Sequence, residues 1–272
     1  MGDDARELAP LPDEPEQLGD LTHDAIAGPM RIWQRRHGHR YSLDDVLTAW
    51  VAAQAKPDAS RVLELGSGVG SVLLMLCYKL PTAHFVAIEA QRNSFALLRR
   101  NVSDSGLATR VALLHGDLRY LLDRGQHGTF DLITGTPPYV PPGQATPSPD
   151  SQRRFARQEL RGGVEDYLAA AGRLLTRAGR VVVCADARTP GRVERAARAS
   201  GLAITDRLDA SPRANKAPLF SVFTLCAASE VEGQCTARMF VARTPEGART
   251  DVYHALREFF GMTRPAAERP SP

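Results

Sequence analysis

Several features that mark special classes of protein are missing from this 272-residue sequence. It has no run of eighteen or more apolar residues, which a transmembrane helix requires, and its first residues are acidic, whereas a signal peptide begins with basic ones. The four cysteines form no C-x-x-C pair of the kind that binds metal or carries redox chemistry. We therefore expect a soluble cytoplasmic protein with reduced cysteines, no metal site and no membrane partner.

Strong charge of either sign is also absent. The net charge of +3 is too mild to indicate a nucleic-acid partner by itself. Basic residues do gather in one short segment, whose members are Arg31, Arg35, Arg36, His37, His39 and Arg40. This segment is suited to contact phosphates, and it is equally compatible with a solvated basic surface.

Both ends of the chain lack apolar periodicity. Residues 1–28 combine prolines with scattered acidic residues, and residues 263–272 are similar in composition, so we expect both segments to be disordered. Ser42 precedes an amphipathic stretch with helical spacing of its apolar residues, which predicts a helix that begins there. We assign residues 29–58 to a helical segment that contributes to substrate binding, and residues 59–262 to one α/β domain.

From residue 61 the sequence alternates short apolar runs with longer helical stretches. This alternation predicts βαβ units, and hence an α/β fold with a doubly wound, mostly parallel sheet of seven strands. The linker between the last two runs is long enough for them to pair as an antiparallel C-terminal hairpin. The expected strands are 62–65, 85–89, 111–115, 132–134, 181–185, 219–226 and 237–243, and helices are expected at 71–79, 94–103 and 191–200.

A glycine-rich segment, ELGSGVG, follows the first expected strand and precedes a helix. Its glycines are Gly66, Gly68 and Gly70. They permit a tight turn and let a ligand approach the bare backbone. Glycine turns between a strand and a helix serve several kinds of nucleotide site, so this segment does not define one cofactor.

Carboxylates end the first three expected strands, at Glu64, Glu89 and Asp117. The carboxyl ends of parallel strands meet at one edge of the sheet, where doubly wound sheets bind ligands. There the second acid is placed to accept ribose hydroxyls, and the third to accept an adenine amino group. Taken singly, each acid is equally explained as a helix cap or a surface charge. A nicotinamide-dependent dehydrogenase is disfavoured because the strand ends in Glu-Leu-Gly and does not lead into G-x-G-x-x-G.

The segment FDLITGTPPY places Thr136, Pro137, Pro138 and Tyr139 directly after the fourth strand. Here the chain resembles methyltransferases that modify a planar nitrogen through an Asn/Asp/Ser-Pro-Pro-Tyr/Phe loop. The resemblance implies that the first side chain and the Pro137 carbonyl accept the N–H bonds of a weakly nucleophilic amine, while Tyr139 stacks on its plane. The chain departs from the family in carrying Thr136 where Asn or Asp is usual. A proline-rich connector is the alternative interpretation of this segment.

Neighbouring segments resemble bacterial methyltransferases that modify N6 of an adenosine next to the anticodon of valine tRNA. They are QRRHGHRYSLDDVL, FARQEL and VEDYLAAAGRLL, and the resemblance extends from about residue 34 to residue 243. It implies a Rossmann-like class I fold and S-adenosyl-L-methionine as cofactor. It also implies that Asp44 or Asp45 lies near the methyl donor or the substrate.

The motifs and the resemblance together name three groups of site residues. The cofactor-binding residues are Gln34, Arg40, Tyr41, Ser42, Glu64, Gly66, Gly68, Gly70, Glu89, Asp117, Leu118 and Thr136. The catalytic residues are Thr136, Pro137 and Tyr139, and the substrate-binding residues are Pro138, Tyr139, Arg153 and Arg157. Arg154 and Arg161 join the last two arginines as candidates for phosphate contacts, although a charged loop and helix start explain them equally well.

The sequence therefore predicts methyl transfer to N6 of adenine in RNA, with tRNA as the expected partner. An unpaired base of an anticodon loop enters a pocket with little unpairing cost, which suits this chemistry. Two alternatives stay open: a methyltransferase for a protein glutamine amide or a small molecule, and a catalytically silent RNA-binding module. The sequence does not specify an oligomeric state.

Overall fold

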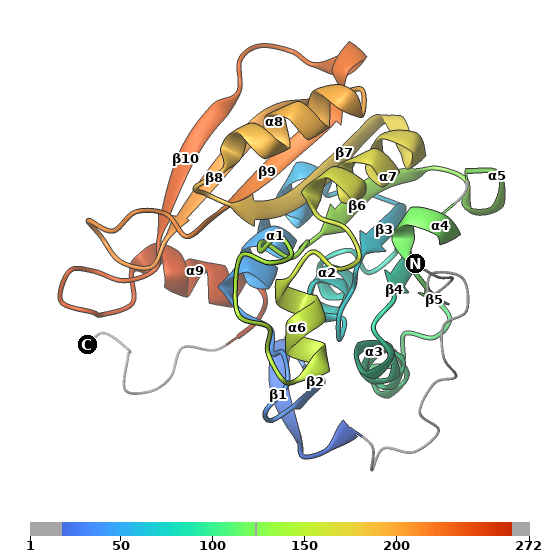
Figure 1. The fold of residues 1–272 in the computed structure, drawn as a ribbon, viewed down its shortest axis with the longest axis vertical. Helices are drawn as coiled ribbons and strands as arrows, with labels where there is room; N and C mark the ends of the chain where they lie inside the picture. Colours follow the sequence, from blue (N-terminus) through green and yellow to red (C-terminus); the bar gives the residue numbers. More distant parts are fainter. Residues whose placement is uncertain (1–17, 123, 263–272) are drawn as a thin grey trace.

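The computed structural model describes residues 18–122 and 124–262, which form one large sheet, a small two-stranded sheet and the helices around them (Figure 1). The large sheet consists, in spatial order, of β10 (Thr236–Val241), β8 (Leu202–Ser211), β9 (Phe220–Ala227), β7 (Leu175–Asp186), β6 (Phe130–Gly135), β3 (Arg61–Leu65), β4 (His84–Glu89) and β5 (Val111–His115). Neighbouring strands from β7 to β5 are parallel. β9 is antiparallel to both β7 and β8.

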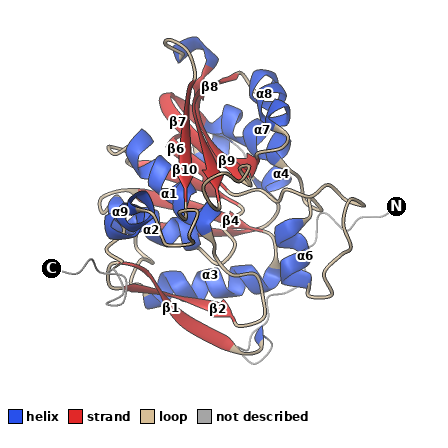
Figure 2. Cartoon of the chain, turned by 90° about the vertical axis from the view of Figure 1, so that its left-hand side faces the viewer, coloured by secondary structure: helices blue, strands red, loops and turns tan. Residues whose placement is uncertain are grey.

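Helices cover both faces of this sheet, as Figure 2 shows. α1 (Leu43–Ala55), α2 (Ser71–Lys79) and α3 (Arg92–Asp104) pack on one face, and α4 (Leu118–Leu121), α7 (Val164–Leu174) and α8 (Pro190–Ala199) pack on the other. The other helical segments are α5 (Arg124–His127), α6 (Ser151–Arg157), the 3₁₀ turn Ala228–Glu230 and α9 (Asp251–Phe259). In the described part of the chain no helix is long and apolar enough to cross a membrane.

The central strands are apolar because both of their faces are covered. Val62, Leu63 and Leu65 of β3 are fully buried, and so are Val182 and Val183 of β7. Side chains that alternate along each strand enter two separate hydrophobic clusters, one on each side of the sheet. The predicted α/β class with a doubly wound, mostly parallel sheet is confirmed.

The C-terminal part of the sheet differs from the prediction. It contains an additional strand, β8, so the sheet has eight strands among the described residues and not seven. β9 forms its antiparallel pairs with β7 and β8, whereas β10 pairs in parallel with β8. The predicted pairing of 219–226 with 237–243 is therefore wrong. β8 escapes notice in the sequence because it carries Asp206, Arg207 and Asp209 and is only partly buried.

The N-terminal region is also more ordered than expected. β1 (Leu21–Ala27) and β2 (Met30–Arg35) form an antiparallel hairpin, so the prediction of disorder is wrong for this part of residues 1–28. The hairpin is stable because Ile26 and Ile32 are fully buried against the main core. Residues 1–17 and 263–272, to which the same prediction applies, lie outside the described residues.

One buried side chain ties the hairpin to the rest of the fold. Asn101 of α3 accepts a hydrogen bond from the backbone N–H of Trp33 at 2.7 Å. Its amide nitrogen donates to the carbonyl oxygens of Trp33 and Val69, at 3.1 and 2.8 Å. Since Val69 belongs to the glycine-rich turn, Asn101 connects the hairpin to the edge of the sheet where ligands are expected.

Candidate active site

The glycine-rich turn joins β3 to α2 at the carboxyl edge of the sheet. Gly66, Gly68 and Gly70 have φ angles of +61°, +56° and +90°, a region that side chains rarely adopt. A Cβ on Gly66 would clash with the hydroxyl of Tyr167, which packs beneath the turn from α7. A Cβ on Gly68 would meet nothing within 4 Å. The turn is therefore packed on its inner side and open on its outer side.

Glu89, at the end of β4, faces this turn. Its two carboxylate oxygens accept hydrogen bonds from the backbone N–H groups of Gly68, at 2.8 Å, and Gln91, at 2.5 Å. The side chain is buried, and burial raises its pKa to about 7 although these bonds and the charge of Arg161 favour the ionised form. Each oxygen accepts one of these bonds and keeps a lone pair, so the carboxylate remains able to accept hydroxyl groups of a ligand.

Asp117 follows β5 and caps the short helix α4. Its carboxylate accepts from the backbone N–H of Arg119 at 3.0 Å and forms an ion pair with the Arg119 guanidinium at 2.7 Å. The Asp117 side chain is nearly buried, whereas that of Arg119 is about one third exposed. Asp117 is thus held in one orientation at the cavity wall, and the backbone of Leu118 lies next to it.

Two further carboxylates are buried beside the turn. Asp45, in the first turn of α1, accepts hydrogen bonds from Ser42 N–H at 2.9 Å and Ser71 Oγ at 3.0 Å. Burial, aided by the charge of Asp44, raises the pKa of Asp45 to about 7. Burial also raises the pKa of Glu64 well above its usual range, and the neighbouring Asp45 adds to this shift. Glu64 therefore lies behind the cavity wall as a structural group.

The Thr-Pro-Pro-Tyr loop leaves the sheet at the end of β6. Thr136 and Pro138 line the main cavity, while Pro137 and Tyr139 line a smaller one behind the loop, which Pro138 also reaches. The Tyr139 hydroxyl lies 3.2 Å from Asp44 Oδ2 and 2.9 Å from Cys184 Sγ. Burial raises the pKa of this phenol well above its usual range. The Tyr139 ring is thus anchored beneath the loop, which differs from the expected position as a stacking surface.

The main cavity brings together about half of the predicted site residues. It encloses about 900 Å³, open solvent at its mouth included. The predicted residues that line it are Tyr41, Asp45, Gly66, Gly68, Glu89, Asp117, Leu118, Thr136, Pro138 and Arg161. The predicted residues that do not line it are Gln34, Arg40, Ser42, Asp44, Glu64, Gly70, Pro137, Tyr139, Arg153, Arg154 and Arg157.

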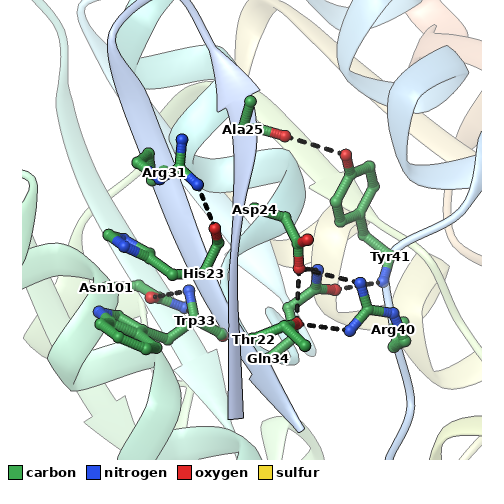
Figure 3. A network of polar contacts seen from close by, with 10 residues as sticks. All are labelled: Thr22, His23, Asp24, Ala25, Arg31, Trp33, Gln34, Arg40, Tyr41 and Asn101. Atoms are coloured by element: carbon green, nitrogen blue, oxygen red, sulfur yellow. Dashed lines mark hydrogen bonds and ion pairs between the residues drawn. The ribbon is translucent and has the colours of Figure 1, made fainter. Parts of the chain in front are cut away.

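Gln34 and Arg40 belong to the hairpin instead (Figure 3). Gln34 is fully buried; its amide donates to Asp24 at 3.1 Å and accepts from the Tyr41 N–H at 2.8 Å. Arg40 pairs with Asp24 at 2.9 Å and donates to Thr22 Oγ1 at 2.6 Å. These polar residues hold the segment before α1 against β1, which places Tyr41 at the cavity but keeps Gln34 and Arg40 out of it.

The basic residues divide into two groups. Arg35 pairs with Asp150 at 2.7 Å and donates to Leu18 O, so it stabilises the fold. Arg36 is exposed, and Arg153 and Arg157 are exposed on α6, although Arg153 Nε also donates to Gly38 O at 3.1 Å. The second group is therefore available at the surface, and Arg153 and Arg157 lie on α6, whose residues Gln152, Phe155 and Ala156 line the cavity.

The cavity also contains residues that the sequence did not assign to the site. Gln152 is buried and bridges His39 N–H and Ser94 Oγ, each at 3.1 Å. Phe155 lies under the Arg161 guanidinium, 4.4 Å from its ring centroid, and both line the cavity. Arg161 was expected only as a phosphate contact, and Tyr167 also lines the cavity. The segments that resemble the tRNA enzymes contain Phe155 and Tyr167, but only the fold shows that these side chains reach the cavity.

Comparisons with known proteins agree with this architecture. A family model described as a methyltransferase domain matches residues 62–145. A solved structure from Agrobacterium tumefaciens, described as a predicted O-methyltransferase, superposes with a TM-score of 0.60 at 17% identity and covers 80% of this chain and 96% of that one. The sheet, the glycine-rich turn and the carboxylates at its edge thus agree with the methyltransferase domain that the family model describes.

The sequence relatives are more specific. The chain is 29% identical over 180 residues to the tRNA1(Val) (adenine(37)-N6)-methyltransferase of Bacteroides thetaiotaomicron, a match that covers 65% of this chain and 73% of that protein. It is 36% identical over 129 residues to the release factor glutamine methyltransferase of Caulobacter vibrioides, covering 47% of this chain and 42% of that protein. Several further relatives with the tRNA1(Val) description are matched over about half to two thirds of their own length.

Proposed function

We propose that this protein methylates N6 of an adenine in RNA, with tRNA as the substrate. One observation carries the proposal: Glu89, Asp117 and the glycine-rich turn line the same cavity as Thr136 and Pro138 of the acceptor loop. A cofactor site and an amine-accepting loop are thereby adjacent, as methyl transfer requires. The resemblance to tRNA adenine-N6 methyltransferases supports adenine as the target.

The residues present fit S-adenosylmethionine. Gly68 leaves the backbone accessible where a Cβ would fill the space, and Glu89 keeps acceptor capacity for a pair of ribose hydroxyls. Asp117 and the backbone of Leu118 are suited to bind the edge of the adenine. The cofactor, when bound, supplies a methyl group on a positively charged sulfur.

The acceptor loop would orient the target amine. The Thr136 hydroxyl, at the main cavity, is the acceptor for one of its N–H bonds. The Pro137 carbonyl oxygen is the second acceptor that the resemblance implies, although this residue lines the smaller cavity. Two adjacent prolines restrict the backbone that carries both acceptors. Because the Tyr139 hydroxyl is held by Asp44 and Cys184, this residue fixes the loop from behind. We assign the stacking surface inside the cavity to Phe155, whose ring lines it.

A glutamine amide is the second candidate target, because the match to the release factor glutamine methyltransferase has the higher identity over its shorter span. Both kinds of target present a planar nitrogen. Only RNA requires contacts to phosphates, and Arg153 and Arg157, which are exposed on the cavity-lining helix α6, favour it.

Transfer of an isotopically labelled methyl group tests the proposal. The protein is incubated with labelled S-adenosylmethionine and either unmodified tRNA or a release factor, and the digested products are analysed by mass spectrometry. We expect N6-methyladenosine from tRNA and no labelled glutamine. Thr136→Ala should lower the rate at least about tenfold because one acceptor is lost, whereas Thr136→Asn should remain active. Labelled glutamine in the release factor, with none in RNA, would favour the second candidate.

A further inference from the structure

A second cavity lies on the other side of Tyr41 from the candidate active site. It is enclosed by the β1–β2 hairpin, the start of α1 and α9, and Tyr41 lines both cavities. Apolar side chains of α1 and α9 form part of its wall. The charged and phenolic side chains that line it are Asp24, Arg40, Tyr41, Arg249, Tyr253 and Arg257.

This lining carries excess positive charge, with three guanidinium groups and one carboxylate. The carboxylate of Asp24 is paired with Arg40 at 2.9 Å, so it does not neutralise the other two arginines. Arg249 lies over the Tyr253 ring, 4.0 Å from its centroid. Among the residues that line this cavity, no second carboxylate faces Arg249 and Arg257. The cavity is therefore suited to bind an anion.

Arg257 provides the most specific evidence that this cavity binds an anion. Its Nε atom is buried and has no hydrogen-bond partner among the described residues. Its charge also acts on Tyr41: burial raises the pKa of this phenol, and Arg257 opposes the rise, so the two groups are close. A buried N–H without an acceptor is costly. Because Arg257 lines the cavity and is only half-buried, its guanidinium can turn toward a bound oxyanion, which would supply the missing acceptor.

The basic surface continues from this cavity toward the edge of the sheet. Arg249 forms an isolated antiparallel bridge with Arg243, which lines a further cavity together with Arg213 and Lys216. Glu246 is the acid that lies near Arg213 here. In Figure 1 the loop after β8 and the loop before α9 both lie at the end of β10 near α9. Basic side chains thus extend from the edge of the sheet to Tyr41.

We propose that the cavity beside Tyr41 binds a phosphodiester group of the RNA strand whose adenine enters the active site. This inference rests on the proposed function. Since Tyr41 lines both cavities, a nucleotide in the first would have a neighbouring phosphate on the side of the second. The forked guanidinium groups match the geometry of phosphate oxygens. Such contacts position the strand without reading its sequence.

The test compares two double variants with the same net charge. Arg249→Gln with Arg257→Gln removes two guanidinium groups from the cavity, and Arg195→Gln with Arg198→Gln removes two exposed ones from α8. Affinity for a fluorescent, unmodified stem–loop RNA with unpaired adenines is measured by anisotropy over a range of salt concentrations. We expect the slope of log affinity against log salt to fall in magnitude by about 0.7 in the cavity variant, because one phosphate contact to single-stranded RNA is lost. The α8 variant should keep the wild-type slope.

The outcomes separate this proposal from the proposed function. If the wild-type protein does not bind the RNA, the proposed function fails and the phosphate site fails with it. If it binds and both double variants keep its slope, the phosphate site is wrong while the proposed function stands. Affinity for S-adenosylmethionine, which both variants should retain, reports on folding. If the double variant unfolds, the salt dependence of RNA affinity is measured on the single variant Arg249→Gln. The magnitude of its slope should be lower than that of the wild type by about 0.7.

Discussion

At the scale of single residues, Glu89 combines an expected binding role with a buried charge. Burial raises its pKa to about 7, so a proton is bound below that pH. If the ionised carboxylate accepts ribose hydroxyls, the Kd for S-adenosylmethionine should rise about tenfold per pH unit below pH 7. Calorimetric titrations at several pH values measure this Kd. The Glu89→Gln variant should bind the cofactor more weakly at pH 8, and its Kd should change less with pH. A Kd that is flat with pH in the wild type would contradict the role.

The same pKa shift predicts how stability varies with pH. The folded state holds the Glu89 proton more tightly than the unfolded chain, whose carboxyl has a pKa near 4.5. The contribution of Glu89 to the free energy of unfolding is therefore greatest below pH 4.5 and falls as the pH rises to about 7. Thermal unfolding at pH 5.5 and 8 should show this fall in the wild type and a smaller one in Glu89→Gln. Equal pH responses of the two proteins would count against a raised pKa.

Gly135 tests how tightly the sheet packs beneath the turn. A Cβ at this position would lie 2.6 Å from the Tyr167 ring and 3.2 Å from the carbonyl oxygen of Leu65. Gly135→Ala should therefore lower the free energy of unfolding by about 1–3 kcal/mol through overpacking. Gly191→Ala on α8 is the matched control, because its Cβ would meet only the flexible end of Arg195. Denaturant unfolding measures both, and equal stabilities would show that Tyr167 moves freely.

At the scale of elements, Asn101 connects the hairpin, α3 and the glycine-rich turn. Asn101→Ala should lower the free energy of unfolding by about 3 kcal/mol, because the Trp33 N–H and the Val69 carbonyl lose their partner in the interior. It should also weaken cofactor binding, since Val69 lies in the turn. Ser103→Ala, an exposed change on the same helix, should alter stability by less than about 0.5 kcal/mol. Hydrogen exchange that stays slow in β1 and β2 of the Asn101 variant would show that the connection is dispensable.

The elements from β3 to β5 were predicted accurately from the sequence, because their strands are buried on both faces and their helices are amphipathic. The expected strands 62–65, 85–89 and 111–115 match the observed ones to within one residue at each end. β1, β2 and β8 were missed, since each is only partly buried and carries charged side chains. α9 was missed although its apolar residues recur at helical spacing along one face. The missed strands depend on distant partners and therefore leave a weak local pattern.

At the scale of the whole molecule, the same distinction applies to the candidate site. Residues that end a strand, such as Glu89, Asp117 and Thr136, were predicted because every parallel strand ends at one edge. Gln34 and Arg40 were placed at the cofactor by resemblance, and the structure places them in the hairpin network, because Asp24 lies within reach of both. No sequence spacing relates Asp24 to these two residues until the hairpin forms. Phe155 lies on α6 and Arg161 in the loop that follows it, and both line the cavity. The periodicity of the sequence does not predict that this helix and loop lie next to the carboxyl edge of the sheet.

In the proposed function, the main cavity binds S-adenosylmethionine between Asp117 and Thr136. Calorimetric titration of the purified protein with this cofactor tests it most directly, repeated on Asp117→Ala and on the exposed control Asp58→Ala. We predict micromolar binding to the wild type and the control, and a loss of about tenfold to hundredfold in Asp117→Ala, the effect of removing a hydrogen bond to a charged group. Absence of binding to the wild type, or equal binding to Asp117→Ala, would contradict the account.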